Sequence, residues 1–251
     1  MKLEGRRILI TGATSGIGAE TARLFAREGA RLALTCLDAT RVAATRAQLA
    51  QPEQHVDLVC DVTDPARVAE CVAEAEVALG GLDGLVHSAG RDHVAPFEAT
   101  TLDAWKLMLD TNLTSAFLLC QAIVPALRSA GGGTIVTLAS GAALRPIEGR
   151  TAYSSAKAGL VMLSKALALE LAADDIRVNA LCPGAIDTPM LRESAGGEVG
   201  DSVPEAVRSR FAMGRVGEVD EMARAVLFLS CRDSSFVTGT ALAADGGRTF
   251  H

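Results

Sequence analysis

Short apolar runs alternate with longer helical patterns along the chain, and this alternation is the strongest constraint on its fold. Seven runs are typical of strands: 6–11, 30–36, 55–60, 82–88, 133–140, 176–182 and 240–245. The segments between the first six are long enough for crossover helices, and residues 217–230 supply a further helix. Near-continuous apolar strands joined by helices indicate a parallel sheet covered on both faces. Because such crossovers are right-handed, we expect a doubly wound α/β sheet of about seven mostly parallel strands, with helices on both faces.

The chain has 251 residues, of which 49% are hydrophobic and 22% charged, as in a globular protein. We expect a single domain over residues 1–251, because the sequence has no repeat and no interdomain linker. Residues 191–210 stand apart, since they are rich in glycine and charge and follow the sixth strand. Ligands bind beyond the carboxyl ends of such sheets, so we expect a substrate lid over about 189–213, with an ordinary surface excursion as the alternative.

Charge and composition argue against several classes of partner. The net charge of −6 disfavours nucleic acid or an anionic membrane as the main partner. No apolar run is expected to approach the ~20 residues of a membrane span. The first residues enter a strand-like run without a signal-peptide pattern, so we expect a cytoplasmic protein. The six cysteines include no Cys-x-x-Cys pair, which argues against a metal site and against a disulfide framework.

Residues 11–18, TGATSGIG, follow the first strand directly and open a helix. Glycines at positions 12, 16 and 18 permit a tight turn and let the backbone approach a pyrophosphate. The helix N-terminus then offers free N–H groups and a partial positive charge to that anion. A plain turn between strand and helix is the alternative, but the position of the glycines favours dinucleotide binding.

Tyr153 and Lys157 lie four residues apart in the run TAYSSAKAGLVML, on the same face of a predicted helix. Such a pair is either a surface pair or an acid–base device. The ammonium favours the phenolate and so lowers a tyrosine pKa from its usual value of about 10. A unit charge at ~4 Å supplies about 4 kcal/mol at an effective dielectric near 20, which is sufficient for this role. We therefore expect Tyr153 to act as a general acid and base.

Eight short segments occur together in the order of one known family. The chain resembles the short-chain dehydrogenase/reductases over essentially its whole length, and the resemblance implies a Rossmann-type fold. Ser140 precedes Tyr153 by the 13 residues usual in that family. The matching segments are TGATSGIG (11–18), DV (61–62), SAG (88–90), Asn112 in DTNLTSAF, Ser140 in VTLAS, YSSAK (153–157), PGAIDTPM (183–190) and VTGTALAADGG (237–247).

The resemblance implies an NAD(P)-dependent oxidoreductase that interconverts a secondary alcohol and a ketone of a small-molecule substrate. It makes Tyr153 the general acid/base and Ser140 a second contact to the substrate oxygen. It places Lys157 on the nicotinamide ribose and Asn112 in a proton relay. A dinucleotide-binding sensor or scaffold without catalysis is the alternative, but it would have no chemical reason to keep this set. The residues expected to bind the dinucleotide are Gly12, Ser15, Gly16, Ile17, Gly18, Asp38, Asp61, Val62, Ala89, Gly90, Tyr153, Lys157, Ile186 and Thr188.

The end of the second strand bears on the choice of cofactor. Cys36 stands where NAD-using relatives most often carry Asp, and Leu37 stands where NADP-using relatives often carry Arg. Asp38 either turns back onto the ribose or caps the next helix. No cation for a 2′-phosphate is present in this stretch, so the sequence favours NAD, with NADP as the alternative.

Three further features of the sequence are an unusual histidine, two arginines before the predicted helix at 152–171, and two long apolar helical segments. His87 replaces the asparagine usual in the family, and we expect a structural histidine. Arg145 or Arg150 either holds an acidic substrate or is a solvated charge. The segments 102–127 and 152–171 are apolar on more than the one side that can pack against the sheet, so another side is expected to contact a second subunit. The resemblance implies a homotetramer built from these two helical segments.

Overall fold

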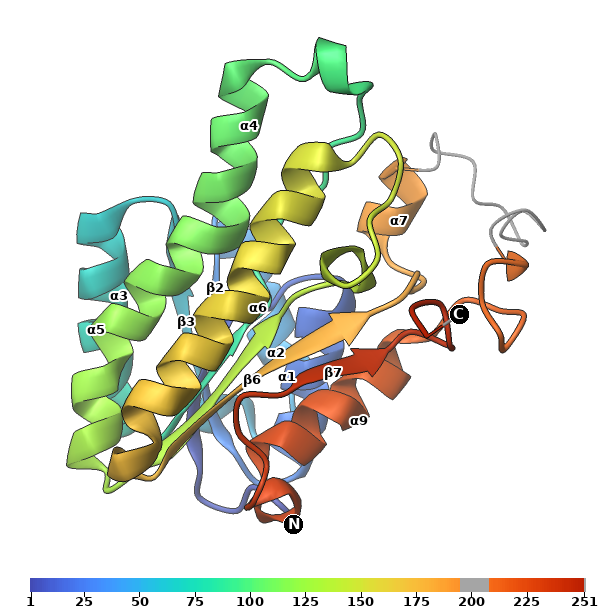
Figure 1. Ribbon diagram of the computed structural model, residues 1–251. Helices are drawn as coiled ribbons and strands as arrows, with labels where there is room; N and C mark the ends of the chain where they lie inside the picture. Colours follow the sequence, from blue (N-terminus) through green and yellow to red (C-terminus); the bar gives the residue numbers. More distant parts are fainter. Residues whose placement is uncertain (195–207, 251) are drawn as a thin grey trace.

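A computed structural model describes residues 1–194 and 208–250, with a seven-stranded sheet through its centre (Figure 1). The strands are β1 (Arg7–Thr11), β2 (Arg31–Cys36), β3 (Val56–Val59), β4 (Gly84–His87), β5 (Gly133–Leu138), β6 (Ile176–Pro183) and β7 (Ala241–Ala244). The α-helices among the described residues are α1 (Gly16–Arg27), α2 (Ala39–Ala47), α3 (Pro65–Leu79), α4 (Leu102–Leu109), α5 (Ser115–Ser129), α6 (Thr151–Leu171), α7 (Pro189–Ser194) and α9 (Val219–Ser230).

The strand order is β3-β2-β1-β4-β5-β6-β7, and every neighbouring pair is parallel. This confirms the doubly wound α/β sheet predicted from the alternation. The order reverses between β1 and β4, where the crossovers leave in opposite directions. In sheets of this kind, the carboxyl ends at that switch point leave a crevice for ligands.

Successive strand side chains point to opposite faces of the sheet and reach two separate cores. Ile8 and Ile10 of β1 are fully buried against residues of α1 and α9, whereas Leu9 is buried on the other face. That other face is covered by α3, α5 and α6, which lie in front of the sheet in Figure 1. A strand covered on both sides must be apolar at every position, which explains the near-continuous apolar runs.

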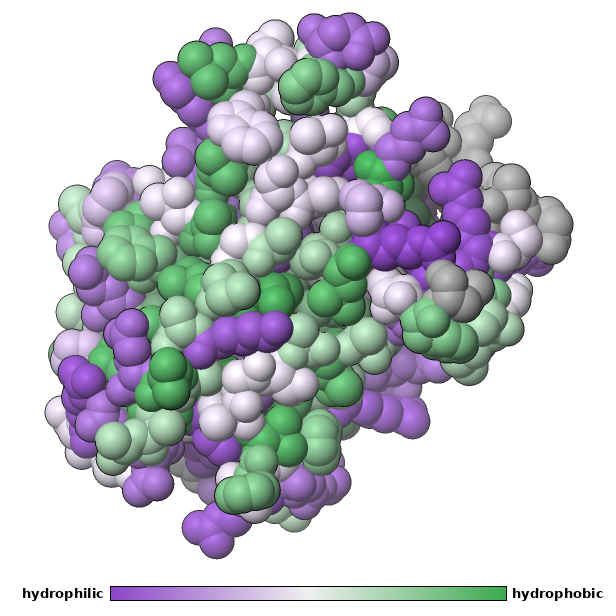
Figure 2. Space-filling model, viewed as in Figure 1, coloured by the Kyte–Doolittle hydropathy of each residue, from purple (hydrophilic) through white to green (hydrophobic). Residues whose placement is uncertain are grey.

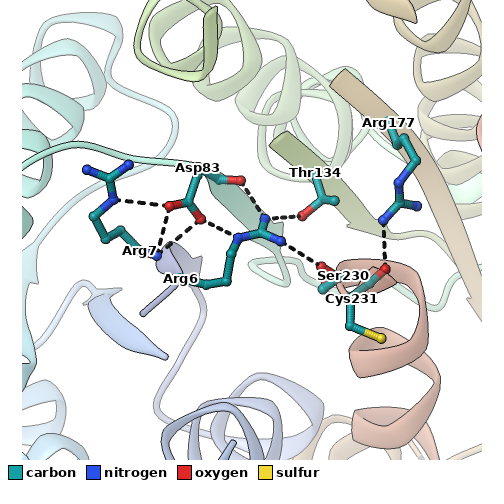
Figure 3. Close-up of polar contacts among 7 residues, drawn as sticks. All are labelled: Arg6, Arg7, Asp83, Thr134, Arg177, Ser230 and Cys231. Atoms are coloured by element: carbon teal, nitrogen blue, oxygen red, sulfur yellow. Dashed lines mark hydrogen bonds and ion pairs between the residues drawn. The ribbon is translucent and has the colours of Figure 1, made fainter. Parts of the chain in front are cut away.

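A network of arginines joins the strands at the amino end of the sheet, opposite the crevice (Figure 3). The carboxylate of Asp83 accepts hydrogen bonds from the side chains of Arg6 and Arg7. Arg6 also donates to Thr134 on β5 and to the carbonyl of Ser230 at the end of α9. The half-buried Asp83 carboxylate and the Arg6 side chain thus connect β1, β4, β5 and α9, and this end of the molecule has a structural role.

The segment predicted as one helix over 102–127 is divided in the structure. Between α4 and α5 lies η3 (Asp110–Thr114), a π-helical turn.

By length and hydropathy, the stretch Leu102–Ser129 is apolar enough to cross a membrane, so the expectation that no run approaches that length was wrong. Only 44% of its apolar window is buried within this chain, although α5 packs against α3 and the sheet.

Candidate active site

A cleft of about 400 Å³ lies at the carboxyl edge of the sheet, beside the switch point between β1 and β4. This volume is in the range of small-molecule sites. The structure brings most of the predicted residues together on its walls. These are Gly12, Ser15, Gly16, Ile17, Ala89, Gly90, Asn112, Ser140, Tyr153, Lys157, Ile186 and Thr188. Four predicted residues do not line the cleft: Gly18, Asp38, Asp61 and Val62.

The turn after β1 is shaped so that only glycine fits at two of its positions. Gly12 has φ +64°, and a Cβ there would lie 2.8 Å from the backbone nitrogen of Ala89. A Cβ on Gly18 would lie 2.3 Å from the carbonyl oxygen of Gly12. Since real side chains do not tolerate such distances, both glycines let α1 approach β1 and β4 closely. Gly18 faces the carbonyl of Gly12 within the turn, and for this reason it does not line the cleft.

The N-terminus of α1 opens into the cleft without a side chain that caps it. Ser15 is the N-cap residue, yet its hydroxyl makes no capping hydrogen bond, and the first turn contains no acidic residue. The backbone N–H groups of this turn therefore lack an anionic side-chain partner and suit a pyrophosphate. Across the cleft, Thr188 donates to the carbonyl of Ile186 and accepts from Leu191 N, which fixes the start of α7. The residues present fit a dinucleotide.

Tyr153 and Lys157 project from the first two turns of α6 toward the end of β5. Lys157 is buried; its Nζ donates to the Leu138 carbonyl at 2.7 Å and lies 5.8 Å from the centroid of the Tyr153 ring. Burial lowers the pKa of Lys157 to about 8. Ser140 follows β5; its hydroxyl accepts from Ala142 N at 3.1 Å and lies near enough to the Tyr153 phenol to lower its pKa. The three side chains thus form one cluster in the cleft.

The Tyr153 phenol is not acidified in the protein alone. Burial raises the pKa of Tyr153 to about 12, and the effect of the nearby Ser140 hydroxyl only partly offsets this rise. The negative charge of Asp92 raises the same pKa, whereas Arg150 lowers it. The sequence predicts that the charges of Lys157 and of an oxidised nicotinamide together lower the pKa of the phenol. Burial acts on this pKa in the opposite direction and is its largest single influence within the protein. The four-residue spacing of Tyr153 and Lys157 in the sequence predicts neither the burial of the phenol nor the presence of the Asp92 carboxylate nearby.

Asn112 lies in the π-helical turn η3, fully buried. Its Nδ2 donates to the carbonyls of Arg91 and Met108, and its Oδ1 accepts from Arg91 N. A Cβ on Gly90 would lie 2.9 Å from this Oδ1 and 3.3 Å from Lys157 Nζ, so both polar groups face the same glycine. π-helical turns occur often at functional sites because they redirect one side chain. Here the turn points the amide toward the ammonium.

His87 occupies the position of the usual asparagine and makes two hydrogen bonds. The hydroxyl of Thr11 accepts from Ala89 N and so donates to His87 Nδ1, 2.9 Å away. His87 Nε2 then donates to the Ser115 hydroxyl at 3.1 Å, and that hydroxyl donates to the Thr111 carbonyl. Burial lowers the pKa of His87 to about 3, and the Lys157 charge acts in the same direction. A neutral histidine therefore joins β1, β4 and the start of α5, as a structural histidine would.

The two acidic residues expected near the adenosine end are engaged in local turns. Asp38 caps α2, because its Oδ1 accepts from Thr40 N and Arg41 N at 2.8 and 3.1 Å. Asp61 accepts from the backbone and hydroxyl of Thr63, and these hydrogen bonds lower the pKa of its carboxyl. Their strands lie side by side in the sheet, so both residues are at the carboxyl edge beyond β1. Val62, next to Asp61, is buried.

A carboxylate that the predicted site did not include connects three walls of the cleft. Asp92, in the loop after β4, forms an ion pair with Arg150 at 2.9 Å and accepts from the Ser194 hydroxyl at 2.9 Å. Ser194 ends α7, within the predicted lid. Arg150 is therefore neither free for a substrate nor a solvated charge. The predicted lid over about 189–213 includes residues 195–207, which lie outside the described residues.

Among the described residues, the metal-binding residue types form no cluster of three, although the Cys60 and Cys71 thiols lie close together. All six cysteines are free, and five of them are buried. Within residues 1–194 and 208–250, no three His, Cys, Asp or Glu side chains lie together as metal ligands would. The fold and the cleft define the class of protein: a doubly wound α/β protein whose crevice fits a dinucleotide.

Comparisons with known proteins specify the class further. A family model described as enoyl-(acyl carrier protein) reductase matches residues 12–249. D-threitol dehydrogenase of Mycolicibacterium smegmatis is 37% identical over 99% of this chain and 94% of its own. 3-Oxoacyl-[acyl-carrier-protein] reductase FabG of Thermotoga maritima is 35% identical over 98% and 99%. The solved structure of Thermoplasma acidophilum aldohexose dehydrogenase, 29% identical, covers 99% of this chain and 96% of its own at a TM-score of 0.88.

The chain belongs to the short-chain dehydrogenase/reductase family, as the resemblance in its sequence predicts. It is an oxidoreductase of alcohol and ketone groups, and enzymes of this family use a nicotinamide nucleotide. The alternative of a non-catalytic sensor is not favoured, because the relatives are named as dehydrogenases and reductases.

Proposed function

We propose that the protein interconverts a secondary alcohol and a ketone, with Tyr153 as the proton donor and acceptor. The observation that carries the proposal is the cluster at the end of β5. Ser140 and Tyr153 line the same cleft, where the Ser140 hydroxyl lowers the pKa of the phenol, and the buried Lys157 ammonium lies 5.8 Å from the centroid of the phenol ring. The chemistry supplied by a bound nicotinamide dinucleotide is hydride transfer to or from the substrate carbon.

Each member of the cluster has a separate task in alcohol oxidation. Ser140 donates to the substrate oxygen and holds it beside the phenol. Tyr153 accepts the hydroxyl proton as the hydride leaves the carbon, and it returns the proton to the oxygen in ketone reduction. Lys157 supplies the positive charge that opposes the effect of burial on the Tyr153 pKa. Its own pKa of about 8 also lets it take up and release a proton near neutral pH.

Asn112 is the positioning residue behind the ammonium. Its side chain and Lys157 Nζ face Gly90 from two sides, and the backbone contacts of η3 hold the amide in place. We assign Asn112 to a proton path from Lys157 toward the loop at Arg91, which leads to the outside of the cleft.

We propose NAD as the cofactor. The carboxylate of Asp38 lies directly after β2, and its Oδ2 is left for a ribose hydroxyl while Oδ1 caps α2. A carboxylate there accepts from the 2′-hydroxyl and repels a 2′-phosphate. Leu37 beside it is largely exposed and brings no positive charge. The proposal includes the backbone of the α1 turn for the pyrophosphate, and Asp61 and Val62 for the adenine.

A homotetramer is the proposed assembly. Large apolar side chains are exposed on α4, α5 and α6, on a face where Figure 2 shows hydrophobic residues among polar ones. They include Leu102 at 65%, Met162 at 63% and Leu169 at 84% exposure. An exposed apolar surface on α4, α5 and α6 suits contact with the same surface of a second copy of the chain. Light scattering at micromolar protein should give four times the chain mass, and a monomeric mass contradicts the proposal.

We also place the protein in the cytoplasm, because six free thiols suit a reducing compartment.

The function is tested with a panel of ketones and secondary alcohols, followed at the absorbance of the reduced nicotinamide with NAD(H) and with NADP(H). We expect turnover of at least one ketone–alcohol pair, with higher kcat/KM for NAD(H). A strong preference for NADPH contradicts the cofactor assignment alone. Dinucleotide binding without turnover of any pair contradicts the oxidoreductase proposal.

A further inference from the structure

The cleft carries an excess of positive charge at one end. Arg150, Arg210 and Arg248 line it, and Asp92 is the only carboxylate on its walls within the described residues. Asp92 is already paired with Arg150. Within the part of the chain that the structure describes, Arg210 and Arg248 have no carboxylate at ion-pair distance. A local excess of guanidinium groups in a chain of net charge −6 favours an anionic ligand at that place.

Arg248 is held in one position by hydrogen bonds to backbone carbonyls. Its Nη1 donates to the carbonyl of Arg145 at 3.2 Å, and its Nη2 donates to that of Pro146 at 3.4 Å. Arg145 in turn donates to the carbonyl of Arg248 at 3.2 Å. These contacts join the loop before α6 to the C-terminal segment. They use part of the guanidinium and leave further N–H groups for a planar anion, which this side chain binds well.

The carboxylate nearest in sequence does not neutralise this charge. Asp245 is buried and accepts from Gly247 N at 2.9 Å and from Thr249 N and Oγ1 at 3.0 and 2.6 Å. Burial lowers the pKa of Arg248, and the nearby charges of Arg145 and Arg210 lower it further against the opposing effect of Asp245. The guanidinium is thus surrounded by like charges, which an anion would relieve.

The position of Arg248 in the cleft assigns the anion to the substrate. Gly141 follows Ser140 directly, and a Cβ on Gly141 would lie 3.7 Å from Arg248 Nη1. Arg248 is therefore next to the reacting end of the cleft, whereas the turn that suits a pyrophosphate follows β1. Figure 2 shows hydrophilic side chains gathered where the loop before α6 approaches the C-terminal segment.

We propose that the substrate carries a carboxylate or phosphate group, which Arg248 and Arg210 bind while its hydroxyl or carbonyl carbon faces Ser140 and Tyr153. The proposal rests on the oxidoreductase function above and adds the class of substrate. The sequence leaves open whether Arg145 or Arg150 holds an acidic substrate or is a solvated charge, and the proposal assigns the anion to other arginines. Arg150 forms an ion pair with Asp92, and Arg145 donates a hydrogen bond to the backbone carbonyl of Arg248.

The test compares ketones that differ only in charge. Acetoacetate is compared with methyl acetoacetate, and hydroxyacetone phosphate with hydroxyacetone, by kcat/KM with NADH. We expect the wild-type enzyme to favour the anionic member of at least one pair by tenfold or more, and the favoured pair identifies carboxylate or phosphate. Arg248→Gln should remove most of that preference, by up to about 30-fold, the effect of one charged hydrogen bond. Arg248→Lys should retain part of it, and Arg210→Gln should lower it less.

Arg224→Gln is the matched control, because Arg224 is an exposed arginine of α9 and should leave the preference unchanged. Turnover of the neutral ketones without preference, or an unchanged preference in Arg248→Gln, overturns the anionic-substrate proposal and leaves the oxidoreductase function in place. Calorimetric titration of acetoacetate and of hydroxyacetone phosphate into enzyme with NAD⁺, where no reduction occurs, gives a readout independent of turnover. Binding weakened in Arg248→Gln supports the proposal, and absence of binding of both to the wild type overturns it.

Discussion

Replacing Lys157 with methionine tests what the buried ammonium contributes to catalysis. Its Nζ lies 5.8 Å from the centroid of the Tyr153 ring. At that separation and an effective dielectric near 20, a unit positive charge stabilises a phenolate by about 3 kcal/mol. A loss of about 3 kcal/mol in transition-state stabilisation lowers a rate about 100-fold. We therefore expect kcat for alcohol oxidation at pH 7 to fall about 100-fold in Lys157→Met.

The same substitution has two opposing effects on stability. Burial lowers the pKa of Lys157 from 10.5 to about 8, so the charged form costs the native state about 3 kcal/mol at pH 7. The unfolded chain binds more protons between these values, so this penalty fades as the pH rises from 8 to 10.5. The variant loses the penalty, but it leaves the Leu138 carbonyl without its donor, at a cost of about 1–3 kcal/mol. The free energy of unfolding should change by no more than about 2 kcal/mol.

The assay combines steady-state kinetics with urea unfolding of the same preparations. In the variant, activity should recover as the pH rises toward 10, because hydroxide then replaces the ammonium as the driving force for loss of the phenol proton. Lys157→Arg is the matched control that retains a positive charge. A folded Lys157→Met enzyme with kcat at pH 7 within about threefold of wild type refutes the electrostatic reasoning.

Three further predictions concern residues around the cluster. Asp92→Asn removes a negative charge that raises the pKa of Tyr153, so the acidic limb of the pH–rate profile for oxidation should move to lower pH; an unchanged or opposite limb contradicts this. Gly18→Ala places a Cβ 2.3 Å from the Gly12 carbonyl, so NAD affinity measured by fluorescence titration should fall tenfold or more; wild-type affinity would show that the turn is not needed. Burial holds the pKa of His87 near 3 rather than 6.5, so stability should fall as the pH drops through that window, by up to about 1.4 kcal/mol per pH unit; His87→Asn should show a flatter dependence in urea unfolding between pH 6.5 and 4.

The sequence predicted the sheet well because its constraint is local. A strand covered on both faces must be apolar at consecutive positions, and Ile8, Leu9 and Ile10 show this in β1. The glycine turn was equally clear, since Gly12 and Gly18 have no room for a side chain. The structure brings Ser140, Tyr153 and Lys157 into one cleft, as the family resemblance indicates.

Contacts between distant segments account for what the sequence did not predict. The π-helical turn at Asn112 depends on backbone groups of Arg91 and Met108, and hydropathy over 102–127 indicates only an unbroken helix. The pairing of Asp92 with Arg150 joins residues 58 positions apart, and nothing in either local pattern predicts it. The place of Arg248 beside Gly141 likewise depends on how the segment after β7 packs against the loop before α6.

Tyr153→Phe tests most directly the claim that this phenol carries the proton. The substitution removes one oxygen, keeps the ring on α6, and leaves the pyrophosphate turn of α1 untouched. We measure kcat with a ketone that the wild-type enzyme reduces, together with the dissociation constant for NAD(H) by fluorescence titration. We expect a loss in kcat of at least about 100-fold, in the range for general acid–base groups, with cofactor affinity within about threefold of wild type. A Tyr153→Phe enzyme that turns over at a comparable rate would contradict this claim.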